Sequence, residues 1–246
     1  MTIQLRRDKE IYATEGGWFS ARWHFSFDAY RDPEQMGVGP LRVFNDDRLQ
    51  PGAVWPLHPH RDIESCTYVA EGSFAHEDSL GNGGRLEAGA AQVMRFSHEG
   101  AEHSEKNGSP SEPMRFIQFW FLPSSEGLAS SVQQRQLSAE DRTDRLLQIM
   151  GPPGEDGLDL AQDARVRVAR LSPGHSVSAS VEPGRGGYLY VLDGAVDLGA
   201  TRLSGGDAAK LFGPEELSLT AAERSELIVI DVPLEFEPVG IWAGRR

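Results

Sequence analysis

The chain has 246 residues, enough for one large domain or two small ones, and its 39% hydrophobic and 25% charged residues are typical of a globular protein. Its 37 acidic and 24 basic residues give a net charge of −13, which disfavours direct binding to nucleic acids or anionic membranes. No apolar run reaches the roughly 18 residues of a membrane span, and the first residues lack the apolar core of a signal peptide. The single cysteine, Cys66, cannot form an internal disulfide and suits a reducing compartment. We therefore expect a cytoplasmic protein in which any metal ligands are histidines and carboxylates.

Short runs rich in Val, Ile, Phe, Tyr and Trp follow one another along the chain, with turn residues at their ends. Each run has the length of a β-strand, and no long helix is predicted between them. The clearest runs are LRVFN, CTYVAEG, QVMRFS, RFIQFWF, RVRVARL, GYLYVLDG and LIVIDVP. Many short strands without long helices predict an all-β fold, either a sandwich or a barrel.

A polar segment rich in proline and glycine, from Ser124 to Asp163, interrupts this pattern and marks a connection between two units. Within the segment, a short helix over 139–147 preceded by Ser138 and a strand over LLQIM are equally good predictions.

Two sequence patterns occur twice, in the same order. TYVAEG precedes Ser73 and LYVLDG precedes Ala195, while RLEAGAAQVM is followed later by RLSGGDAAKL. Glycines after strands also recur by chance in β proteins, but the ordered pair of repeats favours a duplication. We expect two similar β-units, over residues 1–133 and 134–246.

Two pairs of metal-binding residue types lie in the first unit. His58 and His60 are two residues apart, and so are His103 and Glu105. Alternate residues of a strand point to the same face, so each pair can reach one ion. Three imidazoles and one carboxylate suit Fe, Mn, Co, Ni, Cu or Zn rather than Ca or Mg.

Either pair alone is equally compatible with strand histidines that bind nothing. Together, the stretches around the pairs resemble the two motifs of the cupin superfamily, in which Gly52 precedes HPH and Gly100 precedes His103. The spacing from Glu64 to Gly72 is one residue longer than the common pattern, and no proline lies midway between Gly89 and Gly100. Neither departure affects a proposed ligand.

A closer resemblance, to the pirin family of bicupins, covers most of residues 16–135. It is carried by HFSFDAYRDPEQMGVGPLRVFNDDRLQPG, HPHRDIE, TYVAEGSFAHEDSLGN and HSEKN. The second half matches more loosely through RGGYLYVLDGAVDLG, GDAAKL and ELIVIDVP. The resemblance implies two tandem cupin barrels of the double-stranded β-helix, jelly-roll type, packed together. It also implies a set of metal ligands in the N-terminal barrel, namely His58, His60, His103 and Glu105.

The resemblance further implies one divalent transition metal, with Fe(II) as the first expectation and Mn, Co, Ni, Cu and Zn as alternatives. Bacterial members of the family are associated with quercetin 2,3-dioxygenase activity. We therefore expect a dioxygenase that cleaves flavonols such as quercetin with O2 and releases CO, with Glu105 as both ligand and general base. Another metal-chelating aromatic enol is a further possible substrate.

An alternative follows from animal pirin, which is associated with an iron-dependent role beside transcription factors. In this alternative the chain is a non-enzymatic, iron-binding, redox-responsive protein that acts on a regulatory or metabolic partner protein. The same four ligands serve both functions, so the motif does not distinguish them.

The general cupin pattern leaves a second candidate for the carboxylate ligand. Glu64 lies four residues after His60, which would keep it on the ligand face of a regular strand, either as a ligand or as a hydrogen-bond acceptor for a ligand imidazole. The pirin pattern favours Glu105. His24 and His175 have no partner at ligand spacing, and we expect structural positions for both. His76 lies in a hairpin with turn residues, where we expect a structural role, and His98 lies in the loop before Gly100, either solvated or at the pocket mouth.

A cavity for a planar aromatic substrate needs apolar walls. Strand alternation offers candidates that are equally well explained as barrel core, namely Phe25, Phe27, Phe116, Gln118 and Trp120. In the second unit, the offsets between the repeats align the four ligands with Ser180, Glu182, Thr220 and Ala222. These residue types do not form a transition-metal site, so we expect a degenerate C-terminal cupin without metal.

Overall fold

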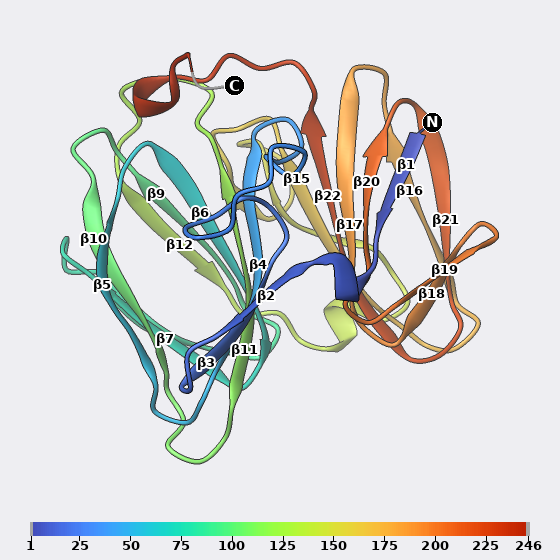
Figure 1. Ribbon diagram of the computed structural model, residues 1–246, viewed down its shortest axis with the longest axis horizontal. Helices are drawn as coiled ribbons and strands as arrows, with labels where there is room; N and C mark the ends of the chain where they lie inside the picture. The colour runs from blue at the N-terminus through green and yellow to red at the C-terminus, as the bar shows by residue number, and fades with distance from the viewer. Residues whose placement is uncertain (1, 245–246) are drawn as a thin grey trace. The chain divides into compact units, whose positions relative to one another are not determined.

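The computed structural model describes residues 2–244, which form β-strands joined by turns and three short 3-10 helices (Figure 1). The helices are η1 (Asp8–Glu10), η2 (Glu140–Arg142) and η3 (Gly240–Trp242). In the described residues no helix is long and apolar enough to cross a membrane. The all-β prediction is confirmed, and each of the seven runs named above contributes to a strand.

The chain divides into two compact units, and each terminal segment joins the unit that is distant in sequence. The N-terminal unit comprises Tyr12–Leu137 and the segment that begins at Glu237, and the C-terminal unit comprises Ser138–Phe236 and the segment that ends at Ile11. The repeated patterns placed the division between residues 133 and 134 and gave no sign of these terminal segments.

The N-terminal unit contains two antiparallel sheets. The larger has the strand order β12-β9-β6-β11-β4-β3-β2, and the smaller has the order β5-β10-β7-β8 (Figure 1). The strands are β2 (Tyr12–Glu15), β3 (Phe19–Trp23), β4 (Leu41–Leu49), β5 (Val54–His60), β6 (Ile63–Glu71), β7 (Ser73–Asp78), β8 (Gly83–Glu87), β9 (Ala91–Phe96), β10 (Ala101–Asn107), β11 (Met114–Phe121) and β12 (Ser131–Arg135).

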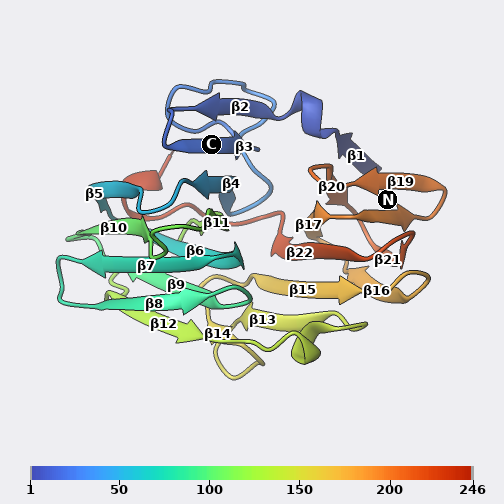
Figure 2. The same cartoon turned by 90° about the horizontal axis from the view of Figure 1, so that it is seen from below.

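The C-terminal unit also contains a seven-stranded and a four-stranded sheet, and its strands pair antiparallel except for β13 and β14, which are parallel. Its larger sheet has the order β1-β20-β17-β22-β15-β13-β14 and its smaller sheet the order β16-β21-β18-β19 (Figure 2). The strands are β1 (Thr2–Arg6), β13 (Leu147–Gly151), β14 (Leu158–Asp159), β15 (Arg165–Leu171), β16 (Ser176–Val181), β17 (Arg185–Asp193), β18 (Ala195–Leu198), β19 (Thr201–Ser204), β20 (Ala208–Phe212), β21 (Glu215–Ala221) and β22 (Ser225–Pro233). The N-terminal segment belongs here because β1 pairs antiparallel with β20.

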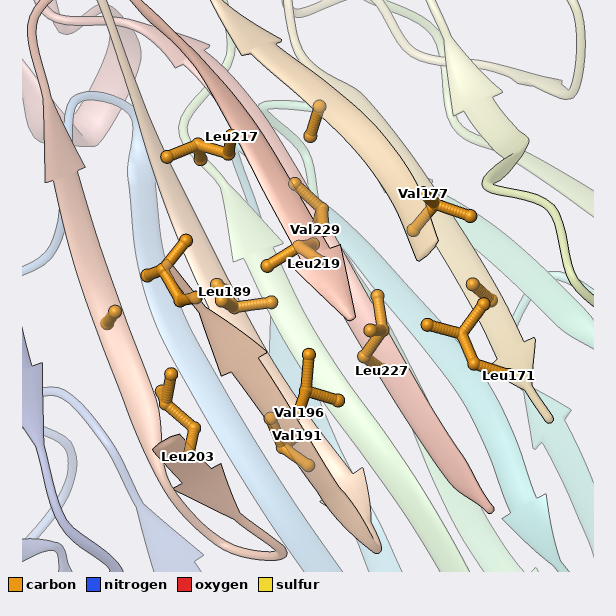
Figure 3. Close-up of a cluster of buried hydrophobic side chains, with 14 of the residues drawn as sticks. Leu171, Val177, Leu189, Val191, Val196, Leu203, Leu217, Leu219, Leu227 and Val229 are labelled. Carbon is orange, nitrogen blue, oxygen red and sulfur yellow. The ribbon is translucent and has the colours of Figure 1, made fainter. Parts of the chain in front are cut away.

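Alternation along the strands fills the interior of the C-terminal unit with aliphatic side chains (Figure 3). In β16 the serines at positions 176, 178 and 180 are exposed, whereas Val177, Ala179 and Val181 are buried in the core cluster. Leu189, Val196 and other aliphatic residues of neighbouring strands complete that cluster. The space that holds histidines in the N-terminal unit is therefore lined by hydrocarbon in this unit.

The repeated glycines at Gly72 and Gly194 have a common physical cause. Both occupy a tight connection between consecutive strands, and their φ angles are 74° and 80°. These positive φ angles are unfavourable for residues that have a Cβ atom. A Cβ at Gly72 would lie 2.5 Å from the carbonyl oxygen of Pro113, and one at Gly194 would lie 2.2 Å from that of Arg224. The sequence repeat thus reflects the same turn in the two units.

Of the two predictions for the connecting segment, the strand is confirmed. β13 pairs with β15, with Leu147 opposite Val168, and helical structure is confined to η2. The helix over 139–147 is wrong because the sheet edge of β15 offers Leu147–Gly151 hydrogen bonds and burial that an isolated nine-residue helix does not provide.

Candidate metal centre

The two predicted ligand pairs lie on adjacent strands. β5 lies beside β10 (Figure 1) and pairs antiparallel with it. The register places His103 opposite His58 and Ala101 opposite His60. The register then shifts between His103 and Glu105, so that Glu105 lies opposite Trp55. The bulge keeps side chains of both strands directed to the same interior face.

The three imidazoles converge on one point. His58, His60 and His103 each offer a ring nitrogen, and these nitrogens all lie within 4.8 Å of one another. The ring centroids are 4.6–4.8 Å apart, with His58 and His103 the nearest pair. The three histidines can therefore hold a metal ion between them.

Glu105 lies directly beside this cluster and is buried, with 2% of its surface exposed. Its Oε1 is 3.3 Å from Nε2 of His103 and accepts a hydrogen bond of 2.8 Å from Nε2 of Gln118. Its Oε2 is 3.9 Å from Nε2 of His58 and has no hydrogen-bond partner. One carboxylate oxygen is thus anchored, and the other is available to a ligand.

Several buried polar atoms of the cluster lack a hydrogen-bond partner. They include Nε2 of His60, both ring nitrogens of His103 and Oε2 of Glu105. Burying a polar atom without a hydrogen-bond partner is unfavourable in free energy. A cation bound between these side chains would accept the lone pairs of the nitrogens and of the carboxylate oxygen. Nδ1 of His58 donates to the carbonyl oxygen of Pro56 over 2.8 Å, which leaves its Nε2 as a free ligand atom. The residues present therefore fit a divalent transition metal.

The electrostatics of the cluster favour neutral imidazoles. Burial and the neighbouring His58 lower the pKa of His60 to about 3. Burial and the surrounding histidines lower the pKa of His103 to about 2. Burial raises the pKa of Glu105, with partial opposition from His58 and from the Gln118 hydrogen bond. Neutral imidazoles are the form that binds metal ions, so these two side chains remain available at neutral pH.

Glu64 does not share the face of the cluster. The strand is interrupted after His60 by Asp62, with a φ of 50°, so the even spacing from His60 to Glu64 does not set a common face. Glu64 lies opposite Phe121 on β11, whereas Trp120, which faces the cluster, lies opposite Ser65. Its Oε1 is 3.1 Å from the guanidinium group of Arg95.

The other histidines are not members of this cluster. His76 is buried on β7 directly opposite Glu105 on β10, and it contacts the side chain of Gln134. His98 is exposed and lies 2.9 Å from Asp62, and His175 is exposed beside Asp144. His24 is buried against the ring of Phe44.

A cavity of about 180 Å³ opens onto the cluster and includes His58, His60 and Glu105 in its walls. Of the predicted wall residues, Phe27, Phe116, Gln118 and Trp120 line it, whereas Phe25 is fully buried outside the lining. The remaining walls were missed by sequence reasoning, and they are Trp23, Asp28, Asn45, Asp47 and Trp55. In the strand LRVFNDDRL, residues two apart share a face, so Val43, Asn45 and Asp47 lie on the same side. This alternation is the signal by which Asn45 and Asp47 could have been found.

A larger cavity of about 560 Å³ shares His60 and Trp120 with the smaller one. It is lined in part by η3, which is fixed because Trp242 Nε1 donates to the carbonyl oxygen of Asp62 and Ile241 N donates to its carboxylate. His60 is the one member of the histidine cluster in its walls. The smaller cavity contacts more of the cluster and is the better candidate for a substrate site.

Two units, each built from a seven-stranded and a four-stranded sheet, with a histidine cluster in one of them, define a bicupin with a candidate metal site. The chain belongs to the pirin family. The family model described as Pirin matches residues 5–121, and that described as Quercetinase C-terminal cupin domain matches residues 148–232. The resemblance inferred from the sequence motifs is thereby confirmed.

Relatives and solved structures agree with this membership. The chain is 38% identical over 224 residues to the pirin-like protein of Caulobacter vibrioides, a match that covers 90% of this chain and 96% of the relative. It is 34% identical over 234 residues to the quercetin 2,3-dioxygenase of Escherichia coli K12, covering 94% and 99%. The crystal structure of the bacterial pirin YhhW from Escherichia coli in complex with nickel(II) superimposes with a TM-score of 0.88 at 30% identity, covering 94% and 99%.

Proposed function

We propose that this protein is a metal-dependent dioxygenase that cleaves flavonols such as quercetin with O2 and releases CO. The observation that carries the proposal is the convergence of three imidazoles beside a buried carboxylate with one unpartnered oxygen, at the wall of an aromatic cavity. A relative of 34% identity that is named quercetin 2,3-dioxygenase supports it.

In this proposal, His58, His60, His103 and Glu105 hold the metal ion, with Fe(II) as the first expectation. A bound divalent transition ion would supply Lewis acidity toward an enol oxygen and a redox-active centre for O2. The same ligand set suits Mn, Co, Ni, Cu and Zn, so cellular supply also decides which ion is bound.

Glu105 acts on the proton of the flavonol 3-hydroxyl group. Its Oε2 has no hydrogen-bond partner and is therefore the oxygen that accepts this proton. Gln118 holds the other oxygen and thereby fixes the direction from which the carboxylate accepts. The reaction consumes one flavonol and one O2, and gives one CO and the ester formed by ring opening.

The aromatic walls orient the substrate and exclude water. Trp120 packs edge-on against His60, with ring centroids 4.8 Å apart, and Trp120 also packs against Phe27. A planar ring entering between these walls is held by apolar contact, while its enol oxygen is directed toward the imidazoles.

The decisive experiment combines metal analysis of the purified protein with O2 uptake and CO release in the presence of quercetin. We expect about one transition ion per chain and O2 consumption matched by CO. The His58→Ala variant should lose metal and turnover together. The control is His175→Ala, which removes an exposed histidine from the C-terminal unit and should retain both.

Full turnover by metal-free His58→Ala would refute the metal mechanism. Absence of flavonol cleavage with each of the six candidate metals, in a chain that nevertheless binds the ion, would refute the dioxygenase and favour the iron-binding, redox-responsive role with a protein partner.

A further inference from the structure

The cavity wall formed by β4 and β11 carries polar groups that the metal centre does not use. Asn45 and Asp47 alternate along β4 and both line the cavity. The register places Asn45 opposite Gln118 and Asp47 opposite Phe116. Because directly opposed residues share a face, the wall runs from the Glu105–Gln118 contact outward to Asp47.

Both side chains have an oxygen atom without a partner. Asn45 is 2% exposed and Asp47 is 5% exposed, and Oδ1 of each has no hydrogen-bond partner. Their neighbour Asp46 is different, since it points to the other face and forms a bidentate pair with Arg115 at 2.7–3.2 Å. A buried acceptor without a donor is unfavourable, so these two oxygens call for a donor from a molecule in the cavity.

The surroundings of the two oxygens define the chemistry of that molecule. Burial, followed by the charges of Asp46 and Glu105, raises the pKa of Asp47. Aromatic side chains complete the walls, among them Trp23, Trp55 and Phe116. The cavity of about 180 Å³ is larger than an engineered cavity of about 150 Å³ that holds benzene, so it has room for a hydroxyl-bearing ring of a larger flavonol.

We propose that Asn45 and Asp47 form a subsite for ring hydroxyl groups, which selects polyhydroxylated aromatic substrates over unsubstituted ones. The subsite rests on the proposed function, because the enol oxygen at the imidazoles sets the position of the ring. Hydroxyl groups on the same molecule then donate to Oδ1 of Asn45 and Asp47 along the β4 wall.

The test measures binding without turnover. Quercetin and 3-hydroxyflavone, which keeps the metal-binding enol and lacks the other hydroxyl groups, are titrated into the metal-loaded protein without O2, and quenching of tryptophan fluorescence is followed. We expect the wild-type protein to bind quercetin at least tenfold more tightly. The Asp47→Leu and Asn45→Leu variants should each lose roughly tenfold for quercetin and little for 3-hydroxyflavone.

Two controls accompany these variants. Asp47→Asn keeps an acceptor oxygen and should retain most of the preference for quercetin. Arg48→Gln changes the next residue of β4, whose side chain is exposed beside Glu71, and should leave both affinities unchanged. Retained binding of 3-hydroxyflavone shows that a variant has kept its fold.

Equal affinity of the wild-type protein for the two flavonols would overturn the subsite, as would equal losses for both in the leucine variants. The outcome is separable from the proposed function. A protein that discriminates the two ligands without O2 and fails to cleave either with O2 retains the subsite and refutes the dioxygenase.

Discussion

Gln118 on β11 donates a hydrogen bond of 2.8 Å to Oε1 of Glu105 on β10. The two strands belong to different sheets of the N-terminal unit, so this contact links the sheets at the candidate metal centre. It also decides which oxygen of Glu105 remains without a partner.

Replacing Gln118 by leucine should weaken metal binding without unfolding the protein. Loss of the hydrogen bond frees the Glu105 carboxylate to rotate, and removing such a supporting contact typically costs 10- to 100-fold in metal affinity or activity. Competition titration with a metal-binding dye measures the affinity. Ser104→Ala, on the strand of Glu105 but outside the cavity lining, is the control, and an equal loss of metal affinity there would contradict the role of the Gln118 hydrogen bond.

Metal addition should stabilise the N-terminal unit. An ion at 100 times its dissociation constant contributes about 2.7 kcal/mol to the folded state, which corresponds to a rise of roughly 5–10 °C in melting temperature. Chelation should reverse the shift. The His103→Ala variant should show little shift, because it removes a central member of the cluster. An unchanged shift in that variant would place the stabilising ion elsewhere.

The N-terminal segment should be held by a pH-dependent contact at Asp207. Burial opposes ionisation of this carboxyl group, but hydrogen bonds from the backbone of Ser204 and Asp8 and from Arg7 outweigh it and lower the pKa of Asp207. A lowered folded-state pKa contributes stability above the unfolded pKa of about 3.9, which is lost as the pH falls through the folded-state pKa.

Asp207→Asn should therefore cost about 1–2 kcal/mol at pH 7 in the unfolding of the C-terminal unit, and the difference from the wild-type protein should shrink in acid. Urea unfolding over a pH series measures it. Asp156→Asn removes the same charge from an exposed turn and should have little effect at any pH. If the loss in free energy of unfolding caused by Asp207→Asn grew as the pH fell, the pKa of Asp207 could not be lowered in the folded state.

The turn at Gly194 should tolerate alanine poorly. Its φ is 80°, and the added Cβ would meet the carbonyl oxygen of Arg224 at 2.2 Å, so we expect a loss of about 2–4 kcal/mol. Gly199 has a φ of 58° with open space around it, so alanine there should cost only about 1–2 kcal/mol. Equal losses in the free energy of unfolding at the two sites would show that the close contact contributes nothing.

The sequence was sufficient to predict the strands and the shared face of His58 and His60 because both depend on local spacing. His58 and His60 share a face by strand alternation, and the glycine-containing repeats reflect a turn that recurs in both units. Family resemblance then supplied the pairing of two stretches more than 40 residues apart, which spacing alone does not determine.

Features that depend on long-range contacts were not predictable in the same way. The expectation for Glu64 assumed a continuous strand, and the turn at Asp62 breaks it. The alignment by fixed offsets placed Ser180 at a ligand position, but the structure directs that serine outward and fills the interior with Val177 and its neighbours. Apart from their shared face, nothing in the sequence distinguishes Asn45 and Asp47 from other strand residues, because the cavity that they line is formed by several strands that are distant in sequence.

The most direct test of the metal centre is anomalous X-ray diffraction from crystals of the metal-loaded protein, recorded at the absorption edge of the bound metal. We expect one peak within about 2.0–2.2 Å of a nitrogen of His58, His60 and His103 and of an oxygen of Glu105. A peak bonded to Glu64 in place of Glu105, or one that lies away from the three imidazoles, would contradict this expectation.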